Sequence, residues 1–114
     1  MSTYSVNNKK HTMKKTVLVM LAACISVYSV TAQTIADGIK YLNYEKNKSA
    51  LEAFRKLHDK SPKDGQTTYW LGQAMLANDD VKGAKDLYQK ALQENGSDPW
   101  VVVGMGHIDI LEGR

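Results

Sequence analysis

Three glycines recur at one fixed interval along this chain of 114 residues: Gly38, Gly72 and Gly106. Other residue types recur at the same interval, as in the pairs Ala50 and Ala84, and Phe54 and Tyr88. A fixed period of about 34 residues is typical of arrays of stacked helical units, in which each unit buries its apolar face against its neighbour. The period therefore constrains the fold of the chain more strongly than its composition does.

Residues 1–32 have the features of a leader rather than of this array. All 12 acidic residues follow residue 32 but only 11 of the 15 basic residues do, so the net charge of +3 comes from the leader. From Met13, a basic pair precedes the uncharged segment 16–30 and small residues up to Ala32. This order is that of a secretory signal peptide at residues 13–32, and its apolar run is shorter than the roughly 20 residues that span a bilayer. Residues 1–12 are polar and patternless, and we expect them to be disordered or to precede the true start.

The leader predicts an exported protein in the periplasm of a Gram-negative bacterium, with a mature chain that begins at Gln33. The single cysteine, Cys24, leaves a second route open. The segment that ends at Cys24, Leu-Ala-Ala-Cys, resembles the signal at which a bacterial lipoprotein receives its lipid anchor. The residues after Cys24 stay apolar, which favours ordinary cleavage after Ala32. Membrane contact is expected only through the signal peptide or through that lipid.

Each unit of the array is predicted to be a pair of helices. Apolar residues recur at helical spacing over residues 34–45 and 48–60, and again over 67–78 and from Val81 to Leu92. In the last of these stretches the residues expected on the buried side are Val81, Ala84, Tyr88, Ala91 and Leu92. Pro62 and Gly96 interrupt the chain after each pair. Pro99 is well placed in the first turn of a fifth helix. We therefore expect two helix pairs at residues 33–64 and 65–98, and a partial third unit at residues 99–114.

The repeated small residues have one physical role, which is to let two helices approach closely while a large side chain fills the adjacent gap. In this pattern the chain resembles the tetratricopeptide repeat family, whose motif is W-x2-L-G-x2-Y followed by A-x3-F, A and P. The residues that carry the resemblance are Gly38, Tyr41, Ala50, Phe54, Pro62, Leu71, Gly72, Ala84, Tyr88, Ala91 and Gly106. The resemblance implies an all-α fold, a right-handed solenoid of antiparallel helix pairs. It also implies that Gly72 is packed more tightly than Gly104.

The sequence contains no nucleophile elbow, phosphate-binding loop or histidine cluster, so we expect no catalytic residue, metal or cofactor. Lysines alternate with acidic residues, which excludes a nucleic-acid stripe. The resemblance implies that the partner is another protein or a peptide, bound on the concave face formed by the first helix of each pair. The residues that it places on this face are Asn43, Tyr69, Gln73, Leu76, Trp100 and His107.

The third unit stops after its first helix, and we expect the natural chain to continue beyond Arg114 with the second helix. The last helix is expected to expose an apolar face beside Trp100 that includes Met105 and Ile108. Such a face would allow two copies of the chain to associate through that helix. Two other roles remain open on the sequence alone. One is the targeting part of a longer periplasmic enzyme, and the other is a self-associating component of the cell envelope.

Overall fold

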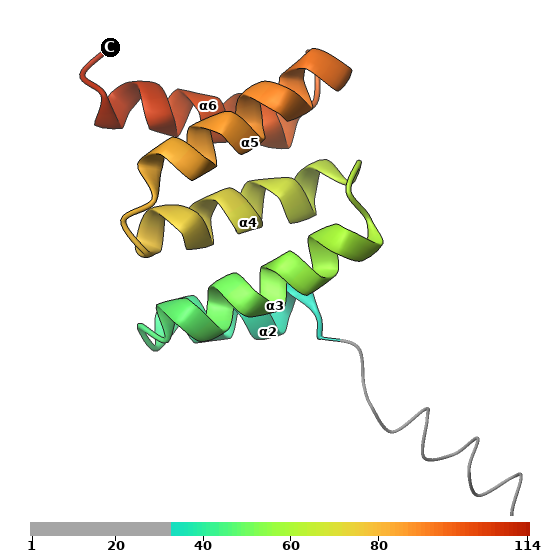
Figure 1. Ribbon diagram of the computed structural model, residues 1–114, viewed down its shortest axis with the longest axis vertical. Coiled ribbons are helices and arrows are strands. Elements are labelled where there is room, and N and C mark those ends of the chain that lie inside the picture. The colour runs from blue at the N-terminus through green and yellow to red at the C-terminus, as the bar shows by residue number, and fades with distance from the viewer. Residues whose placement is uncertain (1–32) are drawn as a thin grey trace, which may run out of the picture. The chain divides into compact units, whose positions relative to one another are not determined.

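The computed structural model describes residues 33–114, and the predicted leader lies outside the described residues. The described part consists of helices and contains no strand. In chain order these are α2 (Ile35–Asn43), α3 (Asn47–Lys60), α4 (Gly65–Ala77), α5 (Val81–Glu94) and α6 (Pro99–Leu111). Consecutive helices are antiparallel and stack into an array (Figure 1). The all-α solenoid of two helix pairs and a further helix is confirmed.

Polar side chains start most of these helices. Asp64, Asp80 and Asp98 are the N-caps of α4, α5 and α6, and each carboxylate accepts a backbone N–H of the first turn. Such a carboxylate satisfies a donor that has no partner within the helix and lies at the positive end of the helix dipole. Thr34 and Asp37 form a capping box on α2. The Thr34 N–H donates to the Asp37 carboxylate and holds the pKa of that carboxyl below its ordinary value.

The turn that follows the first helix of each pair repeats with the same period as the glycines. Its central residue has a positive φ, which is 56° at Glu45, 62° at Asp79 and 76° at Gly113. The next N–H donates to the carbonyl five residues earlier, from Lys46 to Tyr41, from Asp80 to Met75 and from Arg114 to Asp109. Helix α6 therefore ends as α2 and α4 end.

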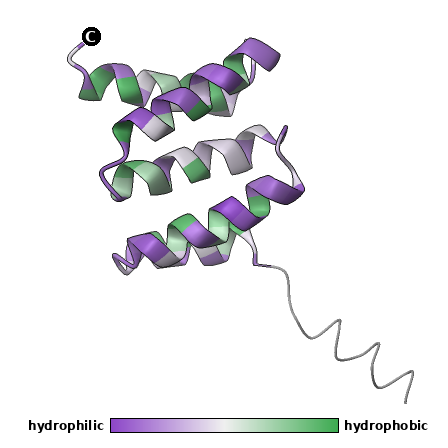
Figure 2. Ribbon diagram, in the orientation of Figure 1, coloured by the Kyte–Doolittle hydropathy of each residue, from purple (hydrophilic) through white to green (hydrophobic). Residues whose placement is uncertain are grey.

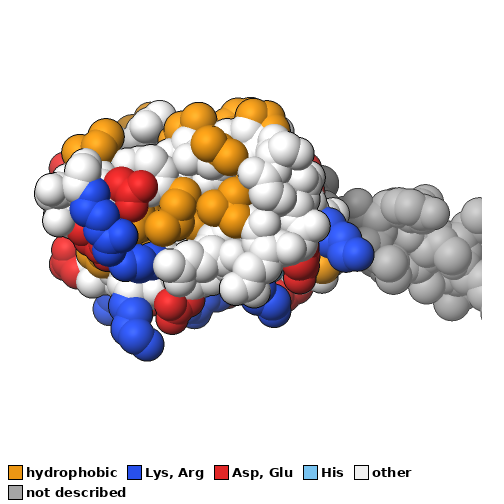
Figure 3. All heavy atoms as spheres, turned by 90° about the horizontal axis from the view of Figure 1, so that it is seen from above, with side chains coloured by type: hydrophobic (Ala, Val, Ile, Leu, Met, Phe, Trp, Pro, Cys, Tyr) orange, Lys and Arg blue, Asp and Glu red, His pale blue; other side chains and the backbone are white. Residues whose placement is uncertain are grey.

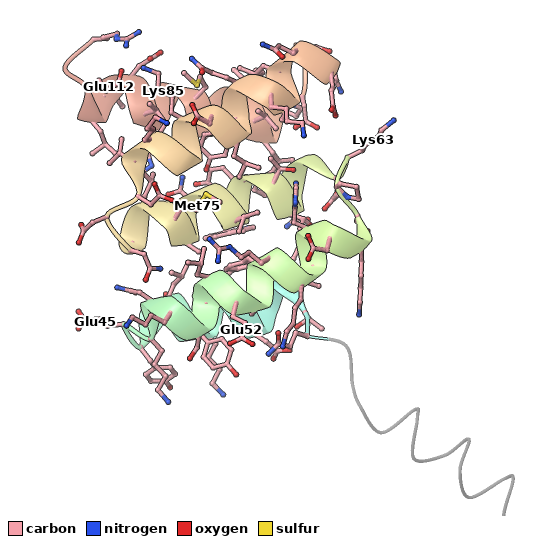
Figure 4. All side chains as sticks on the ribbon, in the orientation of Figure 1. Glu45, Glu52, Lys63, Met75, Lys85 and Glu112 are labelled. Atoms are coloured by element: carbon pink, nitrogen blue, oxygen red, sulfur yellow. The ribbon has the colours of Figure 1, made fainter. Side chains whose placement is uncertain are left out.

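Aromatic rings of the second helices fill the gaps at the repeated glycines. Phe54 of α3 and Tyr88 of α5 are fully buried. A Cβ added at Gly38 would overlap the Phe54 ring, and one added at Gly72 would overlap the Tyr88 ring. The close approach of the two helices in each pair therefore requires glycine at these positions. Met75 of α4, labelled in Figure 4, packs against both of the resulting core clusters.

Gly104 is packed less closely than Gly72, as expected, but it also contacts a core ring. A Cβ added to Gly72 would lie 2.1 Å from the Tyr88 ring. Gly104 is buried in α6, and a Cβ added to it would lie 2.6 Å from the Tyr88 ring. Tyr88 therefore packs between two glycines from different helices, whereas the Phe54 ring has the Trp70 ring stacked at 6.1 Å on the side of the next pair. The period identifies the contact within a pair, but it gives no signal for the contact with the following pair.

Two expectations about burial are wrong. Val81, expected on the buried side of α5, is 37% exposed at the first residue of the helix. Ile108, expected to be exposed, is fully buried with Tyr88, and Met105 is partly buried against the same cluster. The apolar residues that α6 does expose are Trp100, Val102, Val103, Ile110 and Leu111. Figure 2 shows hydrophobic stretches on this helix at the end of the array.

The first helices of the pairs lie closer together than the second helices do. Helix α2 contacts α4, and α4 contacts α6, whereas α3 and α5 of the described chain do not contact each other. A cleft of about 200 Å³ lies between α3 and α5, with His58 on one side and Leu87 and Lys90 on the other. The array therefore bends toward α2, α4 and α6, and these helices form its concave face.

Gly72→Ala and Gly106→Ala should change the free energy of unfolding in opposite directions. At Gly72 the added methyl group overlaps the buried Tyr88 ring, and overpacking of this kind costs about 1–3 kcal/mol. At Gly106 nothing lies within 4 Å of the added Cβ, and alanine in place of an exposed helical glycine stabilises by about 1 kcal/mol. Urea unfolding followed by circular dichroism measures both values. Equal losses of stability at the two positions would contradict the packing described above.

Candidate protein-binding groove

The aromatic residues of the concave face come from α4 and α6. The ring centroids of Tyr69 and Trp100 are 5.5 Å apart, and Tyr69 also meets Trp70 edge to face at 5.2 Å. Because Trp70 stacks on the buried Phe54, the four rings form a continuous row from the core to the surface. Trp100 is 41% exposed. The row therefore ends in an aromatic surface that a ligand can reach.

Gln73 lies at the centre of a chain of hydrogen bonds that joins α4, α5 and α6. Its Nε2 donates to the Tyr88 hydroxyl at 3.2 Å, and that hydroxyl donates to the Tyr69 carbonyl at 2.7 Å. The Gln73 Oε1 accepts from Nδ1 of His107 at 3.1 Å. This arrangement places the proton of the neutral His107 ring on Nδ1 and leaves Nε2 as a hydrogen-bond acceptor.

Burial raises the pKa of Tyr88 to about 12, and the hydrogen bond from Gln73 opposes this rise. The phenol is therefore neutral under physiological conditions and keeps the proton that it donates to the Tyr69 carbonyl. Tyr88, which the sequence predicts to be a core residue, therefore also holds Gln73 and Tyr69 in position. The sequence predicts that these two residues belong to the groove.

The structure brings together four of the six residues predicted for the groove, namely Tyr69, Gln73, Trp100 and His107. Leu76 is partly buried and packs against the cluster around Tyr88, so it supports the groove from beneath. Asn43 is exposed at the last residue of α2, on the first pair, and it belongs to neither the aromatic row nor the hydrogen-bond chain. Four of the six residues predicted for the groove therefore form one surface on α4 and α6, and Asn43 lies outside it.

Hydrogen bonds that the sequence does not predict join the two helix pairs. Asn47 Nδ2 donates to the Ala77 carbonyl at 3.0 Å, and Asn78 Nδ2 donates to the Asn47 carbonyl at 2.8 Å. These bonds join the start of α3 to the end of α4. Asn47 and Asn78 are 31 residues apart, which is off the period, so no repeated position marks them.

Residues 33–114 were expected to hold no metal, and this part of the chain can also be considered for membrane-spanning helices. The histidines and acidic residues of this part form no group of three or more that could hold a metal ion. In the same residues, none of the helices combines the length and the hydropathy needed to cross a bilayer.

Comparison with known families agrees with this arrangement. The profile described as tetratricopeptide repeat matches residues 42–99, which is just over half of the chain. The matched segment contains α3, α4 and α5 in full. Members of this family generally serve as non-catalytic scaffolds in protein–protein interactions. A search of curated proteins finds no match to the chain.

Tyr88→Phe should destabilise the protein at neutral pH by about 1–3 kcal/mol, because it leaves the Gln73 amide and the Tyr69 carbonyl without their partner. Urea unfolding at pH 7 measures this loss. Tyr44→Phe is the matched control, since Tyr44 is 66% exposed and the same change should have no effect there.

The difference in the free energy of unfolding between the wild-type protein and Tyr88→Phe should become smaller at alkaline pH. The folded-state pKa of Tyr88, about 12, lies above the unfolded value of about 10, so the buried phenol loses its contribution as the pH rises from 10 toward 12. Unfolding curves at pH 7 and pH 11 for both proteins test this, since the lysines titrate alike in both. A difference that stays constant or widens would contradict the assigned role of the phenol.

Proposed function

Because the chain belongs to the tetratricopeptide repeat family, we propose that it is a scaffold that binds a peptide or helix of a partner protein in its concave groove. The observation that carries this proposal is the aromatic surface of Tyr69 and Trp100 beside the hydrogen-bonded pair of Gln73 and His107. Aromatic side chains offer a large contact area to an apolar anchor of the ligand. The exposed ring of Trp100 and the polar pair beside it therefore favour a peptide as the ligand.

The polar groups of the groove support binding of the ligand backbone. His107 presents Nε2 as an acceptor for a peptide N–H, and the amide of Gln73 holds the ring in that orientation. The first pair contributes Ile35 and Ile39, which lie on α2 and pack partly against the core. Since none of these residues is Lys or Arg, the groove they form has no clamp for a carboxylate. We infer that apolar side chains of the ligand, rather than an acidic terminus, supply most of the binding free energy.

The groove is tested by selecting ligands without assuming their identity. A displayed library of short random peptides is panned against the chain, and the binding of the enriched peptides is measured by calorimetry. Tyr69→Ala and Trp100→Ala should each weaken binding at least ten-fold, about 1.4 kcal/mol. Tyr44→Ala, which removes an exposed aromatic ring outside the groove, should leave it unchanged. Selected peptides that bind the two groove variants as tightly as the wild type would refute the proposal.

We further propose that the protein is exported and acts in the periplasm. The support is the order of basic, apolar and small residues from Met13 to Ala32. Expression of the whole chain in a Gram-negative host should yield a periplasmic protein whose first residue is Gln33, and Cys24→Ala should not change that result. N-terminal analysis that finds a lipid on Cys24 would establish the lipoprotein route instead, and a cytoplasmic chain with its leader intact would exclude export.

A further inference from the structure

The turn between α5 and α6 contains an asparagine that is followed directly by glycine. Helix α5 ends at Glu94, and Asn95, Gly96 and Ser97 are exposed before Asp98 caps α6. Figure 3 views the array from the end formed by these two helices and shows backbone and uncharged polar atoms, in white, exposed among charged side chains. The Asn95 side chain and the Gly96 backbone are therefore both open to water.

Neither the backbone conformation nor the packing requires glycine at residue 96. Among the glycines of residues 33–114, only Gly113 has a positive φ. A Cβ added at Gly96 would meet only the Leu92 carbonyl, at 3.5 Å, which is an ordinary contact. Within the same residues the Gly96 N–H donates no hydrogen bond to the backbone or to a side chain. Gly96 therefore presents a backbone nitrogen that no side chain of its own crowds and no acceptor holds.

The side-chain amide of Asn95 is polarised by the residue two places later. Its Oδ1 accepts the Ser97 N–H at 3.2 Å and the Ser97 hydroxyl at 3.0 Å. Hydrogen bonds to this oxygen favour negative charge on it and make Cγ more open to a nucleophile. We propose that Asn95 is a site of spontaneous covalent modification, at which the Gly96 nitrogen attacks Cγ of the Asn95 side chain.

The reaction is balanced by water alone. The Gly96 nitrogen forms a bond to Cγ of Asn95 and gives up its proton, the bond from Cγ to Nδ2 breaks, and the leaving amide nitrogen departs as ammonia. A cyclic imide remains, and a water molecule opens it. Addition of water at Cγ gives aspartate. Addition at the backbone carbonyl carbon gives isoaspartate, in which the main chain runs through the side-chain carbon.

Attack on Cγ requires the peptide unit between Asn95 and Gly96 to turn. The ψ angle of Asn95 is 93°, and at this value the Gly96 nitrogen points away from the Asn95 side chain. Within the described residues the Asn95 carbonyl accepts one hydrogen bond, from the Asp98 N–H at 3.4 Å, which is longer than an ordinary N–H···O bond. Because this peptide unit follows the end of α5 and is held by one long bond, it turns more easily than a unit inside a helix.

Two other asparagines of the described chain lack this combination. The Nδ2 atoms of Asn47 and Asn78 donate to backbone carbonyls at 2.8–3.0 Å, so both side-chain amides are held in place. The residues that follow them are Lys48 and Asp79, whose side chains crowd the backbone nitrogen. We therefore expect Asn95 to be modified while Asn47 and Asn78 remain intact.

The modification changes the turn that positions α6. Isoaspartate adds one carbon to the main chain shortly before Asp98, whose Oδ1 accepts the N–H groups of Trp100 and Val101 at 3.0 and 3.3 Å. The Asp98 carboxylate also lies over Gly65, where an added Cβ would overlap it. The lengthened chain should displace this cap from α4. The isoaspartate form should therefore unfold at a lower urea concentration than Asn95→Asp, which has the same charge and an ordinary backbone.

The site is tested by incubating the whole chain in neutral buffer and analysing its proteolytic fragments by mass spectrometry, with isoaspartyl methyltransferase to distinguish isoaspartate from aspartate. Asn95 should give both products, and Asn47 and Asn78 should give neither. Gly96→Ala should slow the conversion at least about ten-fold, because the methyl group crowds the attacking nitrogen. It should not destabilise the fold, since the position is open.

A free peptide with the sequence of residues 92–99 supplies the rate for the same turn without the fold. In the folded chain Asn95 should react at no less than about a tenth of the rate in the peptide. A slower reaction would show that the fold keeps the turn closed and would overturn the proposal. Conversion to aspartate alone, or an equal rate in Gly96→Ala, would also overturn it, because water would then attack the side chain directly. Equal unfolding midpoints for the isoaspartate form and Asn95→Asp would contradict the inferred effect on α6.

Discussion

The contact between an aromatic ring and a glycine on the neighbouring helix is the constraint on which this array depends. Phe54 fits against Gly38, and Tyr88 fits against Gly72 and Gly104. Each ring is wholly buried, and each glycine is at a position where a methyl group would overlap it. Because the interhelical gap is set by one ring and by the absence of one side chain, the helices have a defined separation. The order of the stack follows from repeating this contact.

The candidate binding surface follows from the same contact. The Tyr88 ring that fills the gap between α4 and α6 also places its hydroxyl beside Gln73 and the Tyr69 carbonyl. Through Gln73 the core thereby orients His107, and through Tyr69 it supports the exposed ring of Trp100. The groove residues are thus held by buried groups on a rigid scaffold. A preorganised surface of this kind loses less conformational entropy when a ligand binds.

The fold could be predicted from the sequence because the determining residues lie one period apart, so Gly38, Gly72 and the rings beside them stood out. The family pattern also placed Tyr69, Gln73, Trp100 and His107 on one face. The packing of Gly104 and Ile108 could not be predicted, since it depends on the next helix pair rather than on the period. The hydrogen bonds of Asn47 and Asn78 could not be predicted from the sequence for a similar reason, since they depend on how two helix ends meet.

A double-mutant cycle in the first pair tests the central contact most directly. Gly38→Ala is measured by urea unfolding in the wild-type protein and in the Phe54→Leu background. The added methyl group should cost about 1–3 kcal/mol against the phenyl ring but much less against the shorter leucine, with a coupling energy on the order of 1 kcal/mol or more. If the two substitutions are additive within about 0.3 kcal/mol, the ring and the glycine do not set the separation of the helices.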